Sequence, residues 1–187
     1  MILSSGALPA NCYWAQPHSL LAGEYPADRN PKRIPPKLAQ YLDCGITAFL
    51  DLTEAHEDLR PYDGVLQPLA AARGVDCAYR RIPIIDVSTP HSPSHMRDIL
   101  AQLDSWMGED RRVYVHCWGG VGRTGTAIGC WLVERGMTGA QALQHLQQLW
   151  VTNMSAEKLA KSPQSPETHA QRNYVADWPE VSAIQRT

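Results

Sequence analysis

Cys117 and Arg123, six positions apart, are the residues in this sequence whose types and spacing best fit a chemical reaction. Gly119, Gly120 and Gly122 lie between them. A loop this rich in glycine can turn its backbone N–H groups inward and approach a bound group closely, which makes a concavity that attracts anions. Arg123 adds a planar fork suited to two oxygens of a tetrahedral oxyanion. The spacing therefore predicts a site for a phosphate group.

Cys117 stands at the first position of this loop, where it could act as a nucleophile. A helix predicted to begin near Thr124 would point its positive end at the loop, and this favours a bound anion and a thiolate alike. A thiolate on the floor of an oxyanion site can attack phosphorus directly. The alternative is a structural cysteine in a glycine-rich turn, which would explain a buried Cys117 but not Arg123.

Cleavage of a phosphate ester by a thiolate also needs a proton donor for the departing oxygen. Asp86 is the best candidate because it lies in a loop bounded by Pro83 and Pro90, from which its carboxyl could reach a bound phosphate. The alternative is a turn-forming aspartate that caps Ser88. Asp51 and Asp63 are the fallback carboxylates.

The elements that must position these residues alternate between strand and helix patterns. Val113, Tyr114 and Val115 form a strand that ends abruptly at the glycine-rich loop, and a helix is predicted over 124–135. Further strands are predicted over 46–52 and 75–82, and further helices over 36–44, from Val65 to Gly74, over 93–108 and over 138–151. This alternation indicates an α/β fold, a single domain with a mainly parallel central sheet flanked by helices, and places the loop at the carboxyl edge of the sheet.

The two ends of the chain give weaker patterns. The segment 11–31 is irregular, except that 20–22 could form a short edge strand ending at Gly23. Residues 155–164 are predicted to be an exposed loop or a short helix. A last helix is predicted to start at Ser165-Pro166 and to bury its face at Tyr174, Val175 and Trp178.

The stretch His116-Cys117-x-x-Gly120-x-x-Arg123-Thr124 resembles the His-Cys-x5-Arg-Ser/Thr signature of cysteine-dependent protein phosphatases of the tyrosine and dual-specificity type. A bare Cys-x5-Arg would be weak evidence, but here the histidine, the glycines, the hydroxyl and the strand-to-helix context coincide. The resemblance covers 82–136 most strongly. It implies a dual-specificity-phosphatase-like fold and a cysteinyl-phosphate intermediate, with no metal and no cofactor.

The resemblance also implies a role for each residue of the motif. Cys117 is the nucleophile, Asp86 the general acid and then base, and Thr124 the donor of a hydrogen bond to the sulfur, although Thr124 could equally be an ordinary N-cap. His116 is expected to orient the loop through backbone hydrogen bonds. The phosphate is expected to bind the loop residues Trp118, Gly119, Gly120, Val121 and Gly122 together with Arg123.

Two further features lie beside the motif. The side chain of Trp118 is expected to point outward, either as a wall for an aromatic substrate or as part of the core. Glu167-Thr168-x-x-Gln171 resembles the Gln-Thr-x-x-Gln element that positions water in tyrosine phosphatases, with Glu167 in place of the first glutamine. Because of that departure, the preferred interpretation of this segment is a solvated first helical turn.

Composition narrows the class of protein. A chain of 187 residues fits one domain over 1–187, and a net charge of −2 argues against nucleic acid as the main partner. Five cysteines without a Cys-x-x-Cys spacing argue against a disulfide framework and a zinc site. Residues 1–8 lack the pattern of a secretory signal, and no segment is apolar enough to span a membrane, so we expect a cytoplasmic protein. The sequence does not fix the oligomeric state.

These observations leave three functions to compare. The first is removal of phosphate from phosphotyrosine, with phosphoserine and phosphothreonine as further protein substrates. The second keeps the mechanism but acts on inositol phosphates or phosphoinositides. Relatives of that kind carry lysines within the loop, whereas 118–122 is uncharged here, so Arg80 and Arg81 would have to supply the charge. The third is a rhodanese-type sulfurtransferase or a phosphate-binding module without turnover. A nucleoside-triphosphate P-loop is excluded because Gly-Lys-Ser/Thr is absent.

Overall fold

A five-stranded sheet with the strand order β1-β2-β5-β3-β4 forms the centre of the protein in a computed structural model. The structure describes residues 8–184, and the side chains only as far as 178. The expectation drawn from residues 1–8 therefore lies, apart from Leu8, outside the described residues. The strands are β1 (Cys12–Gln16), β2 (Leu20–Gly23), β3 (Ala48–Asp51), β4 (Ala78–Arg81) and β5 (Val113–His116).

Four of the five strands run parallel, as the alternating pattern predicts, and only β1 is antiparallel to its neighbour β2. The register aligns the last residues of these four strands, because His116 is opposite both Gly23 and Asp51, and Asp51 is opposite Arg81. The loops that follow β2, β3, β4 and β5 consequently meet at one edge of the sheet. Ligand sites of open α/β sheets lie at this carboxyl edge.

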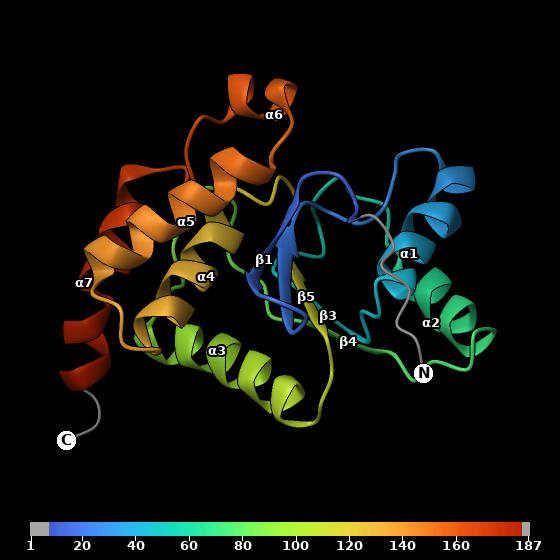
Figure 1. The fold of residues 1–187 in the computed structure, drawn as a ribbon, viewed down its shortest axis with the longest axis horizontal. Helices are drawn as coiled ribbons and strands as arrows, with labels where there is room; N and C mark the ends of the chain where they lie inside the picture. The colour runs from blue at the N-terminus through green and yellow to red at the C-terminus, as the bar shows by residue number, and fades with distance from the viewer. Residues whose placement is uncertain (1–7, 185–187) are drawn as a thin grey trace.

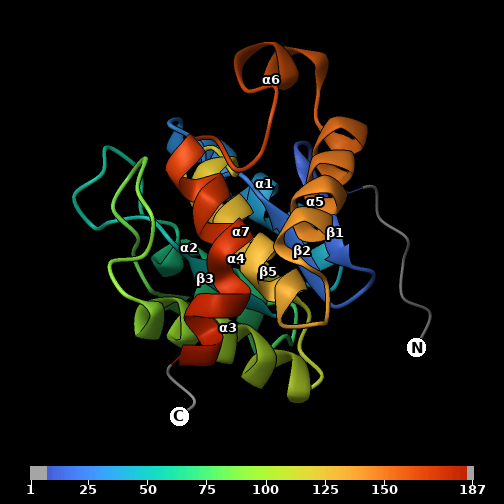
Figure 2. The same ribbon diagram turned by 90° about the vertical axis from the view of Figure 1, so that its left-hand side faces the viewer.

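Helices cover both faces of the sheet (Figure 1). On one face lie α3, α4, α5 and α7, and on the other lie α1 and α2, so that two apolar clusters enclose the strands. Figure 2 shows that the short helix α6 projects beyond the other helices. The helices are η1 (Pro31–Arg33), α1 (Ile34–Asp43), α2 (Asp63–Ala71), α3 (Pro93–Gly108), α4 (Gly122–Val133), α5 (Gly139–Asn153), α6 (Ala156–Lys161) and α7 (His169–Ile184).

Local signals explain most of the helix boundaries. Ser92 accepts a hydrogen bond from the N–H of His95 and so begins α3, as its position before Pro93 predicts. Thr138 and Gln141 form a complete capping box at the start of α5. The helix after the glycine-rich loop begins at Gly122, two residues before the predicted start, so the whole first turn of α4 belongs to the loop region.

The structure differs from the prediction at both ends of the chain. The segment predicted to be irregular contains β1, and β1 covers β2, so β2 is not an edge strand. The short β1 is interrupted by a bulge between Trp14 and Gln16, which hides the alternation that marks a strand. The last helix begins at His169 rather than at Ser165-Pro166, because Thr168 and Gln171 cap it with two reciprocal hydrogen bonds. Val175 and Trp178 of its predicted face are fully buried.

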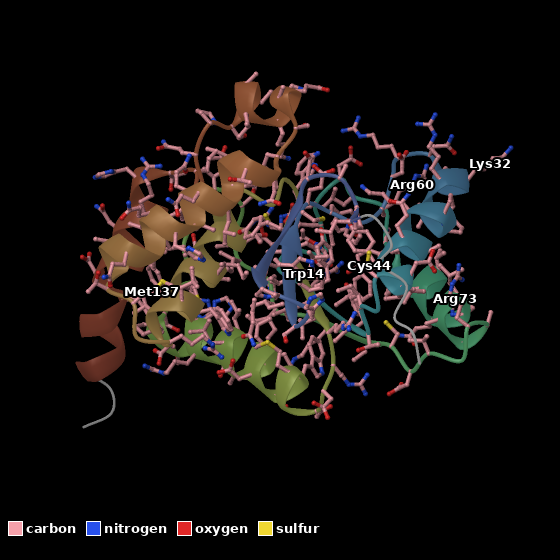
Figure 3. The ribbon with its side chains drawn as sticks, viewed as in Figure 1. Trp14, Lys32, Cys44, Arg60, Arg73 and Met137 are labelled. Atoms are coloured by element: carbon pink, nitrogen blue, oxygen red, sulfur yellow. The ribbon has the colours of Figure 1, made fainter. Side chains whose placement is uncertain are left out.

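The five cysteines are all buried and lie outside disulfides. Figure 3 shows Cys44 on the α1 side of the molecule. Within residues 8–184, each helix is too short or too polar to cross a bilayer.

Candidate active site

Cys117 lies at the bottom of a cavity of about 270 Å³ at the carboxyl edge of the sheet. Its side chain is 3% exposed, and the guanidinium of Arg123 faces the same cavity. The structure brings these two residues and Asp86, all three proposed from the sequence, to one cavity. The lining consists of Asp86, Val87, Cys117, Trp118, Gly119, Val121, Gly122, Arg123, Lys158, Ser162, Glu167 and Gln171.

The loop between β5 and α4 is shaped by a close backbone contact with the end of β2. Gly120 has a φ of 71°, and a Cβ atom there would lie 2.4 Å from the carbonyl carbon of Gly23, so only glycine fits. The N–H of Tyr25 donates to the carbonyl of Trp118 at 2.8 Å and fixes the rim of the loop. These two contacts explain the abrupt end of β5.

The backbone N–H groups of this loop are available to a ligand. Among the described residues, those of 118–121 donate no hydrogen bond to the protein. The first N–H groups of α4, which begins at Gly122, have no acceptor within the helix. Together they form the concave set of donors that an oxyanion requires, with the positive end of the α4 dipole below it.

Arg123 is held by Glu57, a residue that the sequence analysis missed. Nη1 donates to Oε1 of Glu57 at 2.5 Å and Nη2 donates to Oε2 at 3.0 Å. The carbonyl of Ile84 accepts from Nη1 at 3.1 Å. The side chains of Arg123 and Glu57 are 2% and 7% exposed, so this is a buried bidentate ion pair. It fixes the plane of the guanidinium before any substrate arrives.

The ion pair keeps both groups charged. Burial works against the charge of Arg123, but Glu57, Cys117 and Asp86 outweigh it and raise the pKa of Arg123 above its usual value. Burial likewise tends to raise the pKa of Glu57, but the hydrogen bonds from Arg123 and from the N–H of Glu54 hold that pKa below its usual value. Arg123 is therefore a permanent cation in the cavity.

We expect Glu57→Gln to lower the free energy of unfolding by about 3 kcal/mol at neutral pH, because it leaves a buried charge with half of its partner. The lowered pKa means that Glu57 stabilises the fold above the pKa of an unfolded glutamate, about 4.3, and that this contribution is lost as the pH falls through the lower folded value. Urea unfolding at pH 7 and at pH 3 measures both effects.

The exposed neighbour Asp58 supplies the matched control, since Asp58→Asn is expected to change stability by less than about 0.5 kcal/mol. The difference in free energy of unfolding between wild type and Glu57→Gln should be smaller at pH 3 than at pH 7. An equal difference at both pH values would show that the carboxylate charge of Glu57 does not stabilise the fold.

Asp86 approaches the same guanidinium from the loop after β4. Its Oδ1 lies 2.8 Å from Nη2 of Arg123, and its side chain is 50% exposed. The next residue, Val87, has a φ of 59°, which is a strained conformation for a β-branched residue. Strain of this kind, beside a carboxylate that faces the cavity, is typical of a functional loop.

Gln171 holds the other side of the Asp86 loop, and here the sequence interpretation was wrong. The expected solvated turn is instead a contact with the site, since Gln171 is fully buried and its Nε2 donates to the carbonyl of Ser88 at 2.9 Å. A Cβ atom at Gly122 would lie 2.8 Å from the Gln171 amide. Glu167, by contrast, is exposed as predicted for a first turn.

Thr124 and His116 support the loop in different ways. The hydroxyl of Thr124 is fully buried and has no hydrogen-bond partner among the described residues, so the expected bond to the sulfur of Cys117 is not formed. Nδ1 of His116 is 3.2 Å from the carbonyl of Cys117, and Nε2 is 2.6 Å from the hydroxyl of Tyr62. The carbonyl can only accept, so Nδ1 carries the proton and Tyr62 donates to Nε2. His116 therefore anchors the backbone at Cys117, as predicted.

The fallback carboxylates lie outside the cavity. Asp51 is fully buried and accepts from Thr53, Tyr79 and Arg81. Burial tends to raise the pKa of Asp51, but the positive charge that His116 carries at acidic pH, the hydrogen bonds from Thr53 and the charge of Arg81 hold it below its usual value. Burial lowers the pKa of His116 despite this neighbour, so the imidazole is neutral at pH 7. Asp63 begins α2. Of the three carboxylates considered from the sequence, only Asp86 lines the cavity that holds Cys117.

Trp118 separates this cavity from a second one. Its side chain is 43% exposed, as predicted, and lines both spaces. The second cavity measures about 610 Å³ and lies between the loop after β2 and the loop after β3. Arg60 contributes to its wall and lies on the α1 side of the molecule (Figure 3).

Lys158 is a cation of the site that the sequence analysis also missed. It comes from α6, within the segment expected to be an exposed loop or a short helix, and it lines the cavity that holds Cys117. Arg80 and Arg81 do not line it, because Arg81 is paired with Asp51 and Arg80 with Gln102. The additional positive charge therefore comes from Lys158 rather than from β4.

Solved structures with this fold include several phosphatases. Kinase associated phosphatase, with its catalytic cysteine replaced by serine, aligns at a TM-score of 0.66 and 18% identity over 95% of this chain and 98% of that one. Tk-PTP in the active form gives 0.62 and 22% over 91% and 97%. PTPMT1 in complex with PI(5)P gives 0.65 and 14% over 92% and 97%. At these identities the similarity shows the fold alone.

A family model identifies the chain more directly. The model described as the Swiss Army Knife protein, DSP-PTPase phosphatase domain (PTP-SAK), matches residues 9–175. The match contains every strand of the sheet, the loop from Cys117 to Arg123 and Asp86. The chain therefore belongs to the DSP-PTPase family of cysteine-dependent phosphatases.

Proposed function

We propose that the protein hydrolyses phosphoric monoesters, phosphotyrosine first among them, through a cysteinyl-phosphate intermediate. The observation that carries this proposal is the convergence of Cys117, the Arg123 guanidinium, the loop N–H groups and the Asp86 carboxylate on one cavity. Family membership supports a phosphatase over a rhodanese-type sulfurtransferase. The Asp86 carboxylate in the same cavity supports turnover over a phosphate-binding module.

Substrate binding begins with an exchange of partners at Arg123. The phosphate oxygens accept hydrogen bonds from the loop N–H groups and from the Nη2 donor that contacts Asp86 in the free protein. Glu57 keeps its two hydrogen bonds with the guanidinium. The released Asp86 then lies beside the bound phosphate, where its carboxyl can reach the leaving oxygen. Displacement from Arg123 thus prepares Asp86 to act as an acid.

The reaction follows in two steps. The sulfur of Cys117 attacks phosphorus, the P–O bond to the leaving group breaks, and Asp86 gives its proton to the departing oxygen. Water then attacks phosphorus, Asp86 accepts a proton from it, and the P–S bond breaks to return the thiolate and release phosphate. Thr124, whose buried hydroxyl has no hydrogen-bond partner within the described part of the chain, is proposed to donate to the sulfur when the thiolate leaves.

Substrate class is proposed from the walls of the cavity. The exposed indole of Trp118 offers a flat apolar surface beside Cys117, which suits the ring of phosphotyrosine. Phosphoserine and phosphothreonine are shorter and would use less of this surface. A second candidate, hydrolysis of inositol phosphates or phosphoinositides, is favoured by Lys158 at the rim of the cavity, and the related fold of PTPMT1 was solved with PI(5)P.

A substrate panel tests the proposal directly. Phosphate release from phosphotyrosine, phosphoserine and phosphothreonine peptides, from inositol phosphates and from p-nitrophenyl phosphate should be measured without added metal and with a chelator present. Hydrolysis of the aryl phosphates is the expected result. The absence of phosphate release from every member of the panel would overturn the proposed function.

We expect Asp86→Asn to lower kcat by about 10²-fold to 10⁴-fold, because the amide has no proton to give to the leaving oxygen. The loss should be greatest for peptide substrates and smaller for p-nitrophenyl phosphate, whose leaving group needs less protonation. Steady-state rates of both proteins with both substrates measure the two losses.

Asp63→Asn is the matched control, since Asp63 lies at the start of α2 outside the cavity. A full rate at acidic pH in Asp86→Asn would remove Asp86 from the mechanism.

The location of the protein is proposed on chemical grounds. Cys117 can act as a nucleophile only while its thiol is reduced, and it lies outside any disulfide. We therefore infer a reducing compartment, of which the cytoplasm is the simplest case.

A further inference from the structure

Lys158 is placed beside the phosphate loop by contacts that reach across the whole chain. Its ammonium lies next to Gly119, where a Cβ atom would be 3.7 Å from Nζ. Its side chain is only 17% exposed. The side-chain amide of Asn11 connects Glu24 to α6. Its Nδ2 donates to Glu24 at 3.3 Å, and its Oδ1 accepts from the N–H of Ser155 at the start of α6. The lysine is thus held at the cavity rather than extended into solvent.

The ammonium retains unused hydrogen-bonding capacity. Its partner among the described residues is Oε2 of Glu24, at 3.2 Å, while an ammonium carries three N–H donors. Glu24 lines the other cavity, beyond Trp118, whereas Lys158 lines the cavity of Cys117. The ion pair thus crosses the boundary between the two spaces.

We propose that Lys158 binds a second phosphate of the substrate, adjacent to the one that Cys117 attacks. This inference rests on the proposed function. A lysine ammonium binds a phosphate as a point charge, whereas the guanidinium of Arg123 binds the first phosphate through two parallel N–H donors. Asp86 and Glu167 also line the cavity, but Asp86 is committed to Arg123 or to the leaving group, and Glu167 is exposed to water.

The size of the cavity defines the class of substrate. Both cations belong to one space of about 270 Å³, so the two phosphates must be close together. Phosphates on neighbouring carbons of a small ring meet this condition. In an extended peptide, side chains on the same face are about 6.8 Å apart, at about 3.4 Å per residue, and their phosphates lie on long, separate side chains. Among substrates that carry two phosphates, the site therefore fits a compact ring bisphosphate, such as a vicinal inositol bisphosphate.

Two variants at the ion pair give opposite expectations. Wild type should have a higher kcat/KM for a vicinal inositol bisphosphate than for an inositol monophosphate. Lys158→Met should reduce this ratio about 10-fold or more, the usual effect of losing a hydrogen bond between charged groups. Glu24→Gln should raise the ratio, because it removes the carboxylate that competes for the ammonium. Lys161→Met is the matched control on the same helix, where Lys161 is exposed and pairs with Glu157.

The outcomes separate this inference from the proposed function. A panel with no hydrolysis, p-nitrophenyl phosphate included, would refute the proposed function itself. Hydrolysis with a ratio that is unchanged in Lys158→Met, or with a ratio that falls equally in both variants, would show that the ion pair only anchors α6. A higher kcat/KM for a doubly phosphorylated peptide than for the ring bisphosphate would overturn the assigned substrate class.

Discussion

Replacing Cys117 with serine is expected to lower the turnover of p-nitrophenyl phosphate by about 10⁴-fold or more, the scale seen when a catalytic nucleophile is removed. Serine has the size and shape of cysteine, so it fits a position that is 3% exposed and keeps the loop intact. Its hydroxyl, however, is a far weaker nucleophile than a thiolate at neutral pH. Steady-state rates for the two proteins measure the loss.

The serine variant should still bind substrate, because the Arg123 fork and the N–H groups of the loop are unchanged. Calorimetric titration with a phosphotyrosine peptide should give a dissociation constant close to the wild-type KM. Cys77→Ala is the control, since Cys77 is a buried thiol that does not line the cavity. A serine variant with more than a tenth of the wild-type rate would exclude Cys117 as the nucleophile.

Arg123→Lys is expected to lower kcat/KM by about 10³-fold, although the charge is conserved. An ammonium cannot bridge two phosphate oxygens in one plane, and each lost donor to a developing charge costs about 10²-fold to 10³-fold. The lysine would also leave one oxygen of the buried Glu57 without its partner. The measurement is the kcat/KM of the pure variant, together with its thermal midpoint.

Two comparisons identify the cause of that loss. Arg135→Lys, just beyond the other end of α4, changes an exposed pair with Asp104 and should leave kcat/KM within about twofold. Glu57→Gln keeps the arginine and weakens only its support. If Glu57→Gln loses as much kcat/KM as Arg123→Lys, the arginine matters for the shape of the loop and not for contact with phosphate.

The central part of this fold could be predicted because its signals are local. The capping box at Thr138, the Ser92-Pro93 start of α3 and the apolar strand before Cys117 each occupy a few consecutive residues. The strand β1 was missed because it depends on its pairing with β2, which local patterns do not contain, whereas the start of α7 was misplaced although Thr168 and Gln171 form a local capping box. The bulge in β1 is tolerated because β2 pairs with it and covers it.

The same distinction between local and long-range signals holds for the residues of the site. Cys117 and Arg123 lie in one continuous motif, so the motif places both. Glu57 lies 66 positions before Arg123, and Glu24 lies 134 positions before Lys158, so only the folded chain brings these partners together. One signal was available for Gln171: it stands three residues after Thr168, as the capping box of a helix start requires.

Trp118 gives the protein an intrinsic optical reporter of its active site. Its indole is 43% exposed, Trp14 is half-buried, and Trp106, Trp131, Trp150 and Trp178 are at least nine-tenths buried. A collisional quencher such as acrylamide would reach Trp118 first, and Trp14→Phe would remove the other partly exposed indole, so that the accessible share of the emission reports on Trp118. A ligand that enters either neighbouring cavity would shield the ring, and occupancy of the protein could then be followed by fluorescence without a label.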